Sequence, residues 1–577
     1  MIQILKTHLK PYWKQLILIM VLLLLQAIAN LYLPDLNADI INEGVVKGDT
    51  DYIMRAGGVM LSVALGLGVI SIISVYWGSK VAMAFGRDVR HAVFRRVQTF
   101  SLAELNVFGA PSLITRNTND VQQIQMVVLM ALNVMITAPF MAVGGVIMAL
   151  RQDVPLTGLI AVIIPLMAIV IGSLLRIALP LFMQMQVRID RVNQVMREKL
   201  AGIRVIRAFV RSDFEEGRFA QANEELYDVS LKVARLFAIM MPSLMAIFNI
   251  SLVAAMWFGG LRIESGAMPI GNLTAFLTYI MQILMSVMMA TIMFVMVPRA
   301  AASGERINEV LEVEPEITDP EVPAQATDSR GFIEFDDVEF RYPGAEEPVL
   351  CSVSFKAGPG QTTAIVGSTG SGKSTLINLI PRFYDVTGGR ILVDGIDVRE
   401  VTQETLWDKI GFIPQKAFLF KGTVASNVRY GKEDATDEEI WHALDIAQGK
   451  GFVSEMDDGL EAEITQGGSN VSGGQRQRLA IARALVKRPE IYVFDDSFSA
   501  LDFTTDSKLR AALNKDITDA TVIIVAQRVS TIMRADNIIV LDNGAVAGAG
   551  THDELLGTCE TYREIVNSQL TEEEIAS

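Results

Sequence analysis

The chain has 577 residues, of which 51% are hydrophobic and 20% are charged, and its formal net charge is -15. This length allows two or more domains. The negative charge argues against a nucleic-acid partner, because binding a phosphate backbone requires a basic face. The two cysteines, Cys351 and Cys559, lie far apart without a CxxC pattern. Such cysteine usage is typical of a reducing compartment and predicts neither a disulfide nor a zinc site.

Long apolar runs fill the first half of the chain and predict six transmembrane helices. Each run is close to the ~20 residues that about 30 Å of hydrocarbon requires. Lysines precede the first run, as in a secretory signal, but the run is long enough to span a bilayer. The predicted spans are residues 16–33, 56–77, 127–150, 156–177, 236–258 and 270–297.

The charges between the spans predict their orientation. Residues 80–125 and 178–235 are rich in Lys and Arg, whereas the loop after the first span is acidic. Because Lys and Arg stay on the cytoplasmic side, we expect a multi-pass protein of the cytoplasmic (inner) membrane with both termini in the cytosol. The two basic segments read as helical extensions of the spans. Breaks at residues 108–111 and 209–214 fit either short turns that contact a cytosolic domain or ordinary loop tips, and the residues alone favour neither interpretation.

The second half of the chain has a different pattern. The acidic stretch 312–330 contains three prolines and predicts an extended linker. Short runs at 332–340, 363–366, 491–494 and 522–525 are rich in β-branched or aromatic residues and predict strands, with helical patterns between them. We therefore expect a transmembrane domain over residues 1–313, a linker over 314–330, and an α/β domain over 331–577.

A phosphate-binding loop follows one predicted strand. Its GxxxxGK[ST] pattern lies between a strand and a helix, the context that the motif requires. Glycines let backbone N–H groups turn toward phosphates, and the helix N-terminus adds positive potential. Lys373 is expected to reach the β- and γ-phosphates of ATP, and Ser374 and Asp495 to hold Mg²⁺. The loop and its first helical residues are Gly367, Ser368, Thr369, Gly370, Ser371, Gly372, Lys373, Ser374 and Thr375.

A second motif resembles the signature of ATP-binding cassette (ABC) proteins. It consists of Ser472, Gly473, Gly474 and Gln475 after Val471. With six spans before it, the chain resembles an exporter-type half-transporter: an α-helical six-span membrane domain with long cytoplasmic helical extensions, plus an α/β P-loop nucleotide-binding domain. The resemblance implies that two cassettes face each other head to tail. Each ATP then lies between the P-loop of one chain and the signature of the other.

The resemblance also implies roles for single residues. Tyr342 matches the aromatic residue that stacks on adenine, and Gln415 matches the glutamine that touches Mg²⁺ and the attacking water. Residues 499–502 match the loop that couples the two ATP sites. The breaks at 108–111 and 209–214 resemble coupling helices, in regions near 101–112 and 209–214.

The sequence departs from the family pattern at three positions. Asp496 stands where the family has a glutamate as general base, and aspartate is one methylene shorter. Such a displacement can cost about 10²-fold in rate. Gln527 stands where the family has a histidine that contacts the γ-phosphate, and glutamine cannot carry the imidazolium charge. Gln466 replaces a glutamate thought to contact the opposite coupling helix.

Two changes beside an intact P-loop predict an ATP site that binds tightly and hydrolyses poorly. Such asymmetry resembles heterodimeric bacterial multidrug exporters, so we expect a second ABC half-transporter as the partner, with the consensus glutamate and histidine. The leading hypothesis is ATP-driven export of small amphipathic molecules, drugs or lipids, across the membrane. Alternatives are a nucleotide-sensing regulatory subunit, or an importer, as in some siderophore systems, built on the exporter scaffold.

The membrane spans offer few clues to the transported molecule. They carry almost no charge, so no ion relay is visible. Methionines are frequent on the sixth span, and they form pliable apolar surfaces that suit varied ligands, although helix packing explains each one equally well. Residues that are candidates for lining a cavity are Phe140, Phe248, Asn249, Phe276, Gln282, Met281, Met285, Met288, Met289, Met293 and Met296.

Overall fold

A computed structural model describes residues 1–324 and 330–569, without the side chains of 290–292, 294 and 295. Part of the predicted linker, residues 325–329, lies outside the described residues. The chain forms two compact units. The first contains Met1–Gln98 and Pro111–Val313, and the second contains Thr99–Ala110 and Glu314–Ser577.

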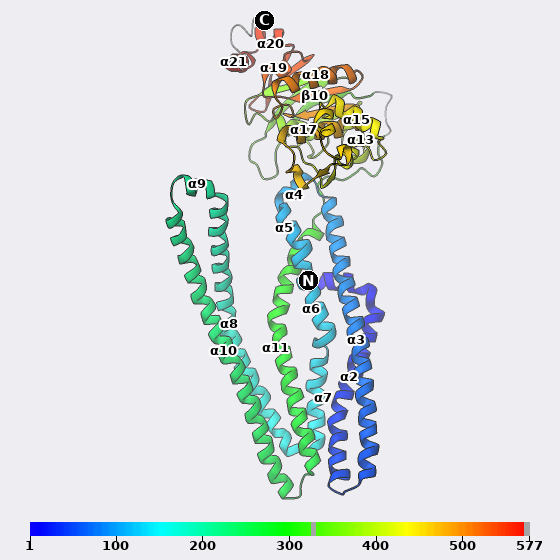
Figure 1. The fold of residues 1–577 in the computed structure, drawn as a ribbon, viewed down its shortest axis with the longest axis vertical. Coiled ribbons are helices and arrows are strands. Elements are labelled where there is room, and N and C mark those ends of the chain that lie inside the picture. The colour runs from blue at the N-terminus through cyan, green and yellow to red at the C-terminus, as the bar shows by residue number, and fades with distance from the viewer. Residues whose placement is uncertain (325–329, 570–577) are drawn as a thin grey trace. The chain divides into compact units, whose positions relative to one another are not determined.

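The first unit is built from long helices (Figure 1). Six helical stretches in the described residues are long and apolar enough to cross a membrane, which confirms the six predicted spans. They continue well past the apolar runs: α3 has 49 residues, which is about 74 Å of helix against ~30 Å of hydrocarbon. The helices are α1 (Ile2–Leu9), α2 (Trp13–Asp39), α3 (Thr50–Gln98), α5 (Ala110–Thr115), α6 (Val121–Met130), α7 (Thr137–Gln152), α8 (Val154–Ala201), α9 (Ile203–Ala208), α10 (Ser212–Glu264) and α11 (Ile270–Glu312). Short helical segments of other types are η1 (Lys10–Tyr12), η2 (Ile40–Val45), η3 (Arg116–Asp120) and η4 (Ala131–Met135).

The core of the first unit lies near the junction of α7 and α8. Asp153 begins α8 as its N-cap, since its carboxylate accepts a hydrogen bond from the Leu156 amide at 2.8 Å. The buried apolar residues of α8 in this core lie between Leu156 and Ile171, and they pack with α10 and α11. Farther along, α8 and α10 run side by side toward α9 and separate from α11 (Figure 1).

The second unit contains two main sheets. The larger sheet has the strand order β12-β11-β3-β10-β9-β6 and is parallel except for β12. The smaller, antiparallel sheet has the order β2-β1-β4-β5. The strands are β1 (Ile333–Phe340), β2 (Leu350–Ala357), β3 (Thr362–Gly367), β4 (Gly388–Val393), β5 (Ile396–Asp397), β6 (Ile410–Ile413), β7 (Gly422–Thr423), β8 (Glu463–Ile464), β9 (Ile491–Asp495), β10 (Thr521–Val525), β11 (Asn537–Asp542) and β12 (Ala545–Gly550).

Helices connect these strands and confirm the α/β fold. They are α12 (Lys373–Leu379), α13 (Gln403–Lys409), α14 (Val424–Arg429), α15 (Asp437–Ile446), α16 (Lys450–Ser454), α17 (Gly473–Lys487), α18 (Phe503–Asp516), α19 (Val529–Ile532), α20 (His552–Thr558) and α21 (Glu560–Gln569), with short turns at η5 (Gly459–Glu461) and η6 (Gln466–Gly468). The predicted strands at 332–340, 363–366, 491–494 and 522–525 correspond to β1, β3, β9 and β10. Because β3, β9 and β10 are parallel neighbours, their carboxyl ends meet at one edge of the sheet.

The first predicted break, residues 108–111, is the junction between a short helix, α4 (Leu102–Phe108), and α5, and α4 belongs to the second unit. Ser101 and Glu104 cap its N-terminus reciprocally, and Gly109 ends it with a φ of 71°. Within the unit, the Asn106 amide donates to the Tyr384 hydroxyl at 3.1 Å. Glu104 also accepts a hydrogen bond from the backbone amide of Glu316 at 2.8 Å.

The second predicted break is narrower than the sequence suggested. The turn covers residues 209–211, between α9 and α10, and α10 already begins at Ser212. Helix α9 has no buried residue, and Phe209 and Val210 beyond it are 73% and 86% exposed. This turn therefore presents apolar side chains that its own unit does not cover.

Candidate nucleotide-binding site

The P-loop connects β3 to α12 and depends on glycine. Gly370 and Gly372 have φ values of 88° and 96°, a region that other residues rarely adopt. A Cβ at Gly372 would also lie 2.7 Å from Leu350 Cδ2. The backbone can therefore curl around an anion at the start of α12 only because these positions are glycine.

Lys373 is a half-buried cation that no carboxylate in the described part of the chain neutralises through an ion pair. Its Nζ donates to the carbonyl oxygens of Gly367 at 2.9 Å and Ser368 at 2.7 Å. Burial lowers the pKa of Lys373, although the charges of Asp496 and Asp495 act in the opposite direction. A phosphate in the loop would supply the missing counter-charge.

Two adjacent carboxylates lie at the end of β9. Burial and the charge of Asp496 raise the pKa of Asp495, while hydrogen bonds from Ser374 and from the Gln415 backbone oppose this rise. The structure therefore brings Ser374 and Asp495 together, as the sequence predicts. Crowded, partly desolvated carboxylates beside a hydroxyl offer the hard oxygen ligands that Mg²⁺ prefers, so this donor set fits the predicted metal.

Asp496 is held in an unusual backbone conformation. Its φ is 45°, its side chain is buried, and its backbone amide donates to the Val525 carbonyl at 3.0 Å. The Gln415 side-chain amide donates to Asp496 Oδ2 at 3.2 Å. Burial raises the pKa of Asp496 even though Gln415, Ser499 and the Gln527 backbone amide favour its ionised form. The carboxylate is thus occupied by this chain's own donors.

Gln527 follows β10 and has an exposed side chain. Its backbone carbonyl accepts a hydrogen bond from Gln569 Nε2 at 2.7 Å. Gln569 Oε1 in turn accepts from the Val529 amide at 2.9 Å. The last residue of α21 thereby fixes the loop that carries Gln527. No motif in the sequence marked Gln569, because its role depends on a contact across 42 residues.

Tyr342 lies beside the first turn of the P-loop helix. Its hydroxyl is 3.0 Å from Thr375 Oγ1, and its ring meets the Tyr384 ring edge-on at 5.4 Å. The side chain is half-buried. This placement brings Tyr342 to the P-loop, and its stacking on adenine stays a prediction.

The signature motif begins α17. Ser472 is the N-cap and forms a capping box with Gln475, while Ser472 and Gly473 are exposed. A Cβ at Gly474 would lie 3.3 Å from the Ala500 carbonyl, so the signature packs against residues 499–502. Gln466, before the signature, is exposed. Ser472 and Gly473 thus place a helix N-terminus, with its backbone donors, at the surface of this unit.

The membrane-spanning unit contains methionine-rich cavities. One of about 230 Å³ is lined by Val127, Met130, Val134, Met135, Met289, Met293, Met296 and Val297. Another of about 80 Å³ is lined by Met167, Met241, Leu244, Met245, Phe248, Leu284, Met285 and Met288. Five of the predicted methionines and Phe248 line these cavities. Phe276 does not, because it is fully buried in the contact of α11 with its neighbouring helices.

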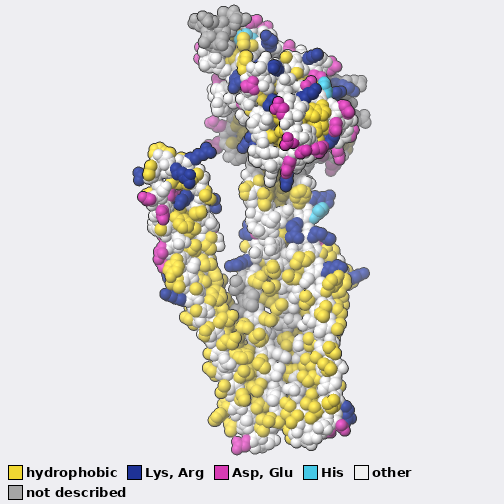
Figure 2. Space-filling view, viewed as in Figure 1, with side chains coloured by type: hydrophobic (Ala, Val, Ile, Leu, Met, Phe, Trp, Pro, Cys, Tyr) yellow, Lys and Arg dark blue, Asp and Glu magenta, His cyan; other side chains and the backbone are white. Residues whose placement is uncertain are grey.

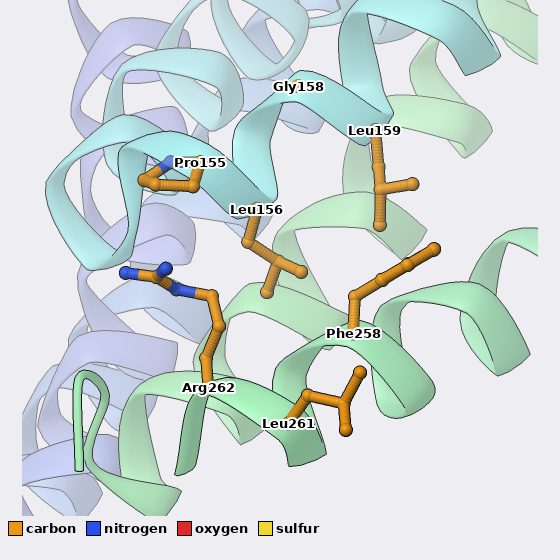
Figure 3. Close-up of a pocket in the computed structure, with 7 residues that line it drawn as sticks. All are labelled: Pro155, Leu156, Gly158, Leu159, Phe258, Leu261 and Arg262. Atoms are coloured by element: carbon orange, nitrogen blue, oxygen red, sulfur yellow. The ribbon is translucent and has the colours of Figure 1, made fainter. Parts of the chain in front are cut away.

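A further cavity of about 460 Å³ lies between the start of α8 and the end of α10. Figure 3 shows Phe258 and Arg262 from α10 facing Leu156 and Leu159 from α8. Arg262 Nε donates to Asp153 Oδ2 at 2.7 Å, and the Asp153 side chain is 4% exposed. The one charged group at this cavity is thus already neutralised.

Comparisons with known proteins agree with this architecture. Residues 16–287 match the family model of the ABC transporter transmembrane region, and residues 350–499 match that of the ABC transporter. An uncharacterized ABC transporter ATP-binding protein of Mycobacterium tuberculosis is 50% identical over 574 residues, 99% of this chain and 98% of that protein. An ATP-dependent lipid A-core flippase of Desulfotalea psychrophila is 30% identical over 533 residues, 92% of each protein.

A solved structure of a bacterial Atm1-family ABC exporter with ATP bound superimposes with a TM-score of 0.80 and 25% identity, covering 98% of this chain and 99% of that one. The match extends over both units described above. The chain therefore belongs to the ABC transporter family, as an exporter that joins a six-helix transmembrane domain to an ATP-binding domain and couples ATP hydrolysis to transport.

Proposed function

We propose that the chain is one half of a heterodimeric exporter of small amphipathic molecules, and that its own P-loop site binds MgATP but hydrolyses it poorly. The observation that carries this proposal is Asp496. It occupies the position of the general base with a side chain one methylene too short, and Gln415 bonds its carboxylate at 3.2 Å. Gln527 beside it cannot supply a charged donor. The P-loop and the signature, in contrast, are complete.

Groups from several elements of the cassette bind the nucleotide. The P-loop amides and Lys373 take the phosphates, Tyr342 takes the adenine, and Ser374, Asp495 and Gln415 hold Mg²⁺. The bound metal neutralises phosphate charge. The signature residues Ser472, Gly473, Gly474 and Gln475, of which the first two are exposed, complete the ATP site of the partner chain.

The exposed apolar surface of the turn after α9 supports the proposal that a partner chain is present. Helix α9 lies about 70 Å along α8 from Asp153, beyond a ~30 Å hydrocarbon layer. Lipid tails therefore cannot cover Phe209 and Val210. Exposure of these apolar side chains to water is unfavourable in free energy. In Figure 2, basic side chains surround this turn, whereas hydrophobic side chains cover the helices below it. Because Lys and Arg stay on the cytoplasmic side, this basic turn lies on the cytosolic side of the cytoplasmic membrane, and so does the cassette.

The transported molecules are proposed to be lipids or lipid-like drugs. The methionine-rich cavities provide adaptable apolar walls. One relative of the whole chain is named a lipid A-core flippase, which supports a lipid-like substrate.

A second candidate function is nucleotide sensing. The same hydrogen bond from Gln415 that occupies the Asp496 carboxylate suits a site that retains ATP and holds the assembly closed. An Asp496→Glu, Gln527→His chain distinguishes the two. Continued transport at higher turnover indicates an impaired motor, and uncoupled turnover indicates a regulatory clamp.

The main proposal is tested with the purified pair in liposomes. MgATP should drive a fluorescent phospholipid outward in the pair, and this chain alone should hydrolyse ATP far more slowly. Lys373→Ala should weaken ATP binding at the site of this chain, with Lys356→Ala on the exposed face of β2 as the control. A homodimer that hydrolyses ATP as fast as the pair would contradict the heterodimer.

A further inference from the structure

A fourth cavity differs from the others in its polar lining. It has a volume of about 420 Å³ and lies between α3, η3 and α6. Its walls combine three apolar side chains with an arginine, a threonine and two glutamines. The lining residues are Met83, Arg90, Thr118, Gln122, Gln125, Met126 and Leu129.

Arg90 brings an uncompensated positive charge to this cavity. Its Nη1 donates to Gln125 Oε1 at 3.2 Å, and it forms no ion pair with a carboxylate of the residues that the structure describes. The Gln125 amide nitrogen lies 2.9 Å from Met83 Sδ, a weak acceptor. The cavity therefore holds several hydrogen-bond donors and no carboxylate.

Three other arginines of the same unit that lie near buried positions are neutralised by carboxylates. Arg262 at the cavity of Figure 3 pairs with Asp153, and Arg306 pairs with the buried Asp120. Arg116 pairs with Glu309 at 2.7 Å. A charge left without a carboxylate inside a partly enclosed cavity has a stronger preference for an anion than one on the open surface.

The polar cavity adjoins the larger methionine cavity on the same helix. Met126 and Leu129 of α6 line the first, and Val127 and Met130 line the second. Consecutive residues of a helix point about 100° apart, so the two cavities occupy neighbouring faces of α6. The polar cavity thus lies next to an apolar cavity of about 230 Å³ around the same helix.

We infer that the two cavities form one binding site for a single-chain amphipath with an anionic head group. Arg90, Gln122 and Thr118 bind a carboxylate or phosphate, and the methionine cavity takes the hydrocarbon chain. This inference rests on the proposed function and narrows it, because it excludes cationic drugs as preferred substrates. Charge-assisted hydrogen bonds supply the selectivity for the head group, and methionines tolerate chains of different shape.

The test measures binding to the complex of this chain and its partner in lipid nanodiscs. Tritiated palmitate is the probe, and hexadecyl phosphate, hexadecanol and hexadecylamine are competitors with the same chain length. Palmitate or hexadecyl phosphate should bind at least tenfold more tightly than hexadecylamine, and the stronger of the two identifies the head group. Equal affinity of the amine and both anions would overturn the inference.

Variants of α3 locate the charge. Arg90→Gln should weaken palmitate binding about tenfold, the worth of one charge-assisted hydrogen bond, and leave hexadecanol binding unchanged. Arg90→Lys should retain most of the affinity. Arg95→Gln, on an exposed residue of the same helix outside the cavity, is the matched control.

Equal effects of Arg90→Gln and Arg95→Gln would refute the site. The proposed function fails by a different result. If MgATP drives no transport of any amphipath while palmitate still binds through Arg90, the exporter proposal is wrong and the anion site stands. If transport proceeds but Arg90→Gln binds palmitate normally, only the site is wrong.

Discussion

The length of one side chain controls the chemistry proposed for Asp496. A glutamate at this position extends one methylene farther toward the nucleotide, and a histidine at position 527 supplies a charged donor. We expect Asp496→Glu with Gln527→His to raise ATP turnover at this site by up to about 10²-fold. The measurement is the ATPase rate of the pair after the P-loop lysine of the partner has been removed.

The control for this experiment adds Lys373→Ala to the double variant, which should abolish the gain because the phosphates lose their cation. A double variant that hydrolyses ATP no faster than the natural chain would show that another feature limits the rate.

The raised pKa of Asp496 also predicts a pH-dependent stability. Burial disfavours the ionised carboxylate, so the folded state favours the protonated form, and this stabilising contribution is lost as pH rises through the raised pKa. Above that raised pKa, the buried charge destabilises the nucleotide-free fold. Asp496→Asn should therefore raise the Tm of the cassette transition at pH 7.5, by about 2–4 °C for each kcal/mol regained. The gain should shrink as the pH falls toward the acidic range.

Asp502→Asn provides the opposite case for the same thermal measurement. Hydrogen bonds with Thr505 lower the pKa of Asp502, which is the N-cap of α18. Its neutral variant should gain no stability at pH 7.5. A lower or unchanged Tm for Asp496→Asn at that pH would contradict the cost assigned to the buried carboxylate.

At this scale, sequence reasoning succeeded where a motif is local. The P-loop, Asp495 and the signature are short runs whose backbone conformation follows from their own glycines and caps, and the structure places them at strand ends and helix starts. Gln569 could not be found in this way. Its contact with Gln527 depends on how α21 packs, which no short sequence pattern encodes.

At the scale of elements, α21 controls the loop after β10. Tyr562 and Val566 bury its apolar face completely, and Gln569 binds the backbone on both sides of Arg528. We expect Gln569→Ala to remove both hydrogen bonds and to speed amide exchange at residues 527–529 about tenfold, the worth of roughly one net hydrogen bond. Hydrogen exchange followed by mass spectrometry measures this change.

Ser568→Ala is the matched control for α21, because the Ser568 hydroxyl donates to the Ile565 carbonyl of its own helix at 2.8 Å. Equal exchange rates at 527–529 in the two variants would mean that the packing of α21, and not Gln569, holds the loop.

The number of membrane-spanning helices was more predictable than their ends or the direction in which their side chains face. Apolar runs fixed the number of spans, but their ends did not mark the ends of helices, because α3, α8 and α10 continue as charged extensions. The sequence also did not predict whether a given side chain of a span faces the core or a cavity. Phe276 and Met285 are similar apolar residues of one helix, yet the first is buried in the core and the second lines a cavity. Neighbouring helices decide this difference.

At the scale of the whole molecule, the two ATP-binding features of the chain, its signature motif and its own hydrolytic position, differ in how well they match the family pattern. Its signature is complete and begins with the exposed Ser472 and Gly473 at the start of α17, whereas its own hydrolytic position holds Asp496. If two different chains form two composite sites, the competent site combines the P-loop of the partner with this signature. The two features of this chain then contribute to different sites and should differ in their effect on turnover.

Ser472→Ala should therefore lower the ATP turnover of the pair by about 10²-fold, as expected for loss of a preorganised donor at the reacting phosphate. Asp496→Asn should change the same rate less than about twofold, since the impaired site contributes little turnover. Ser469→Ala, three residues before the signature, controls for local disturbance of the loop. Steady-state phosphate release by the reconstituted pair measures all three. If Asp496→Asn lowers turnover as strongly as Ser472→Ala, the site of this chain is itself a full motor, and the assembly works with two equivalent sites.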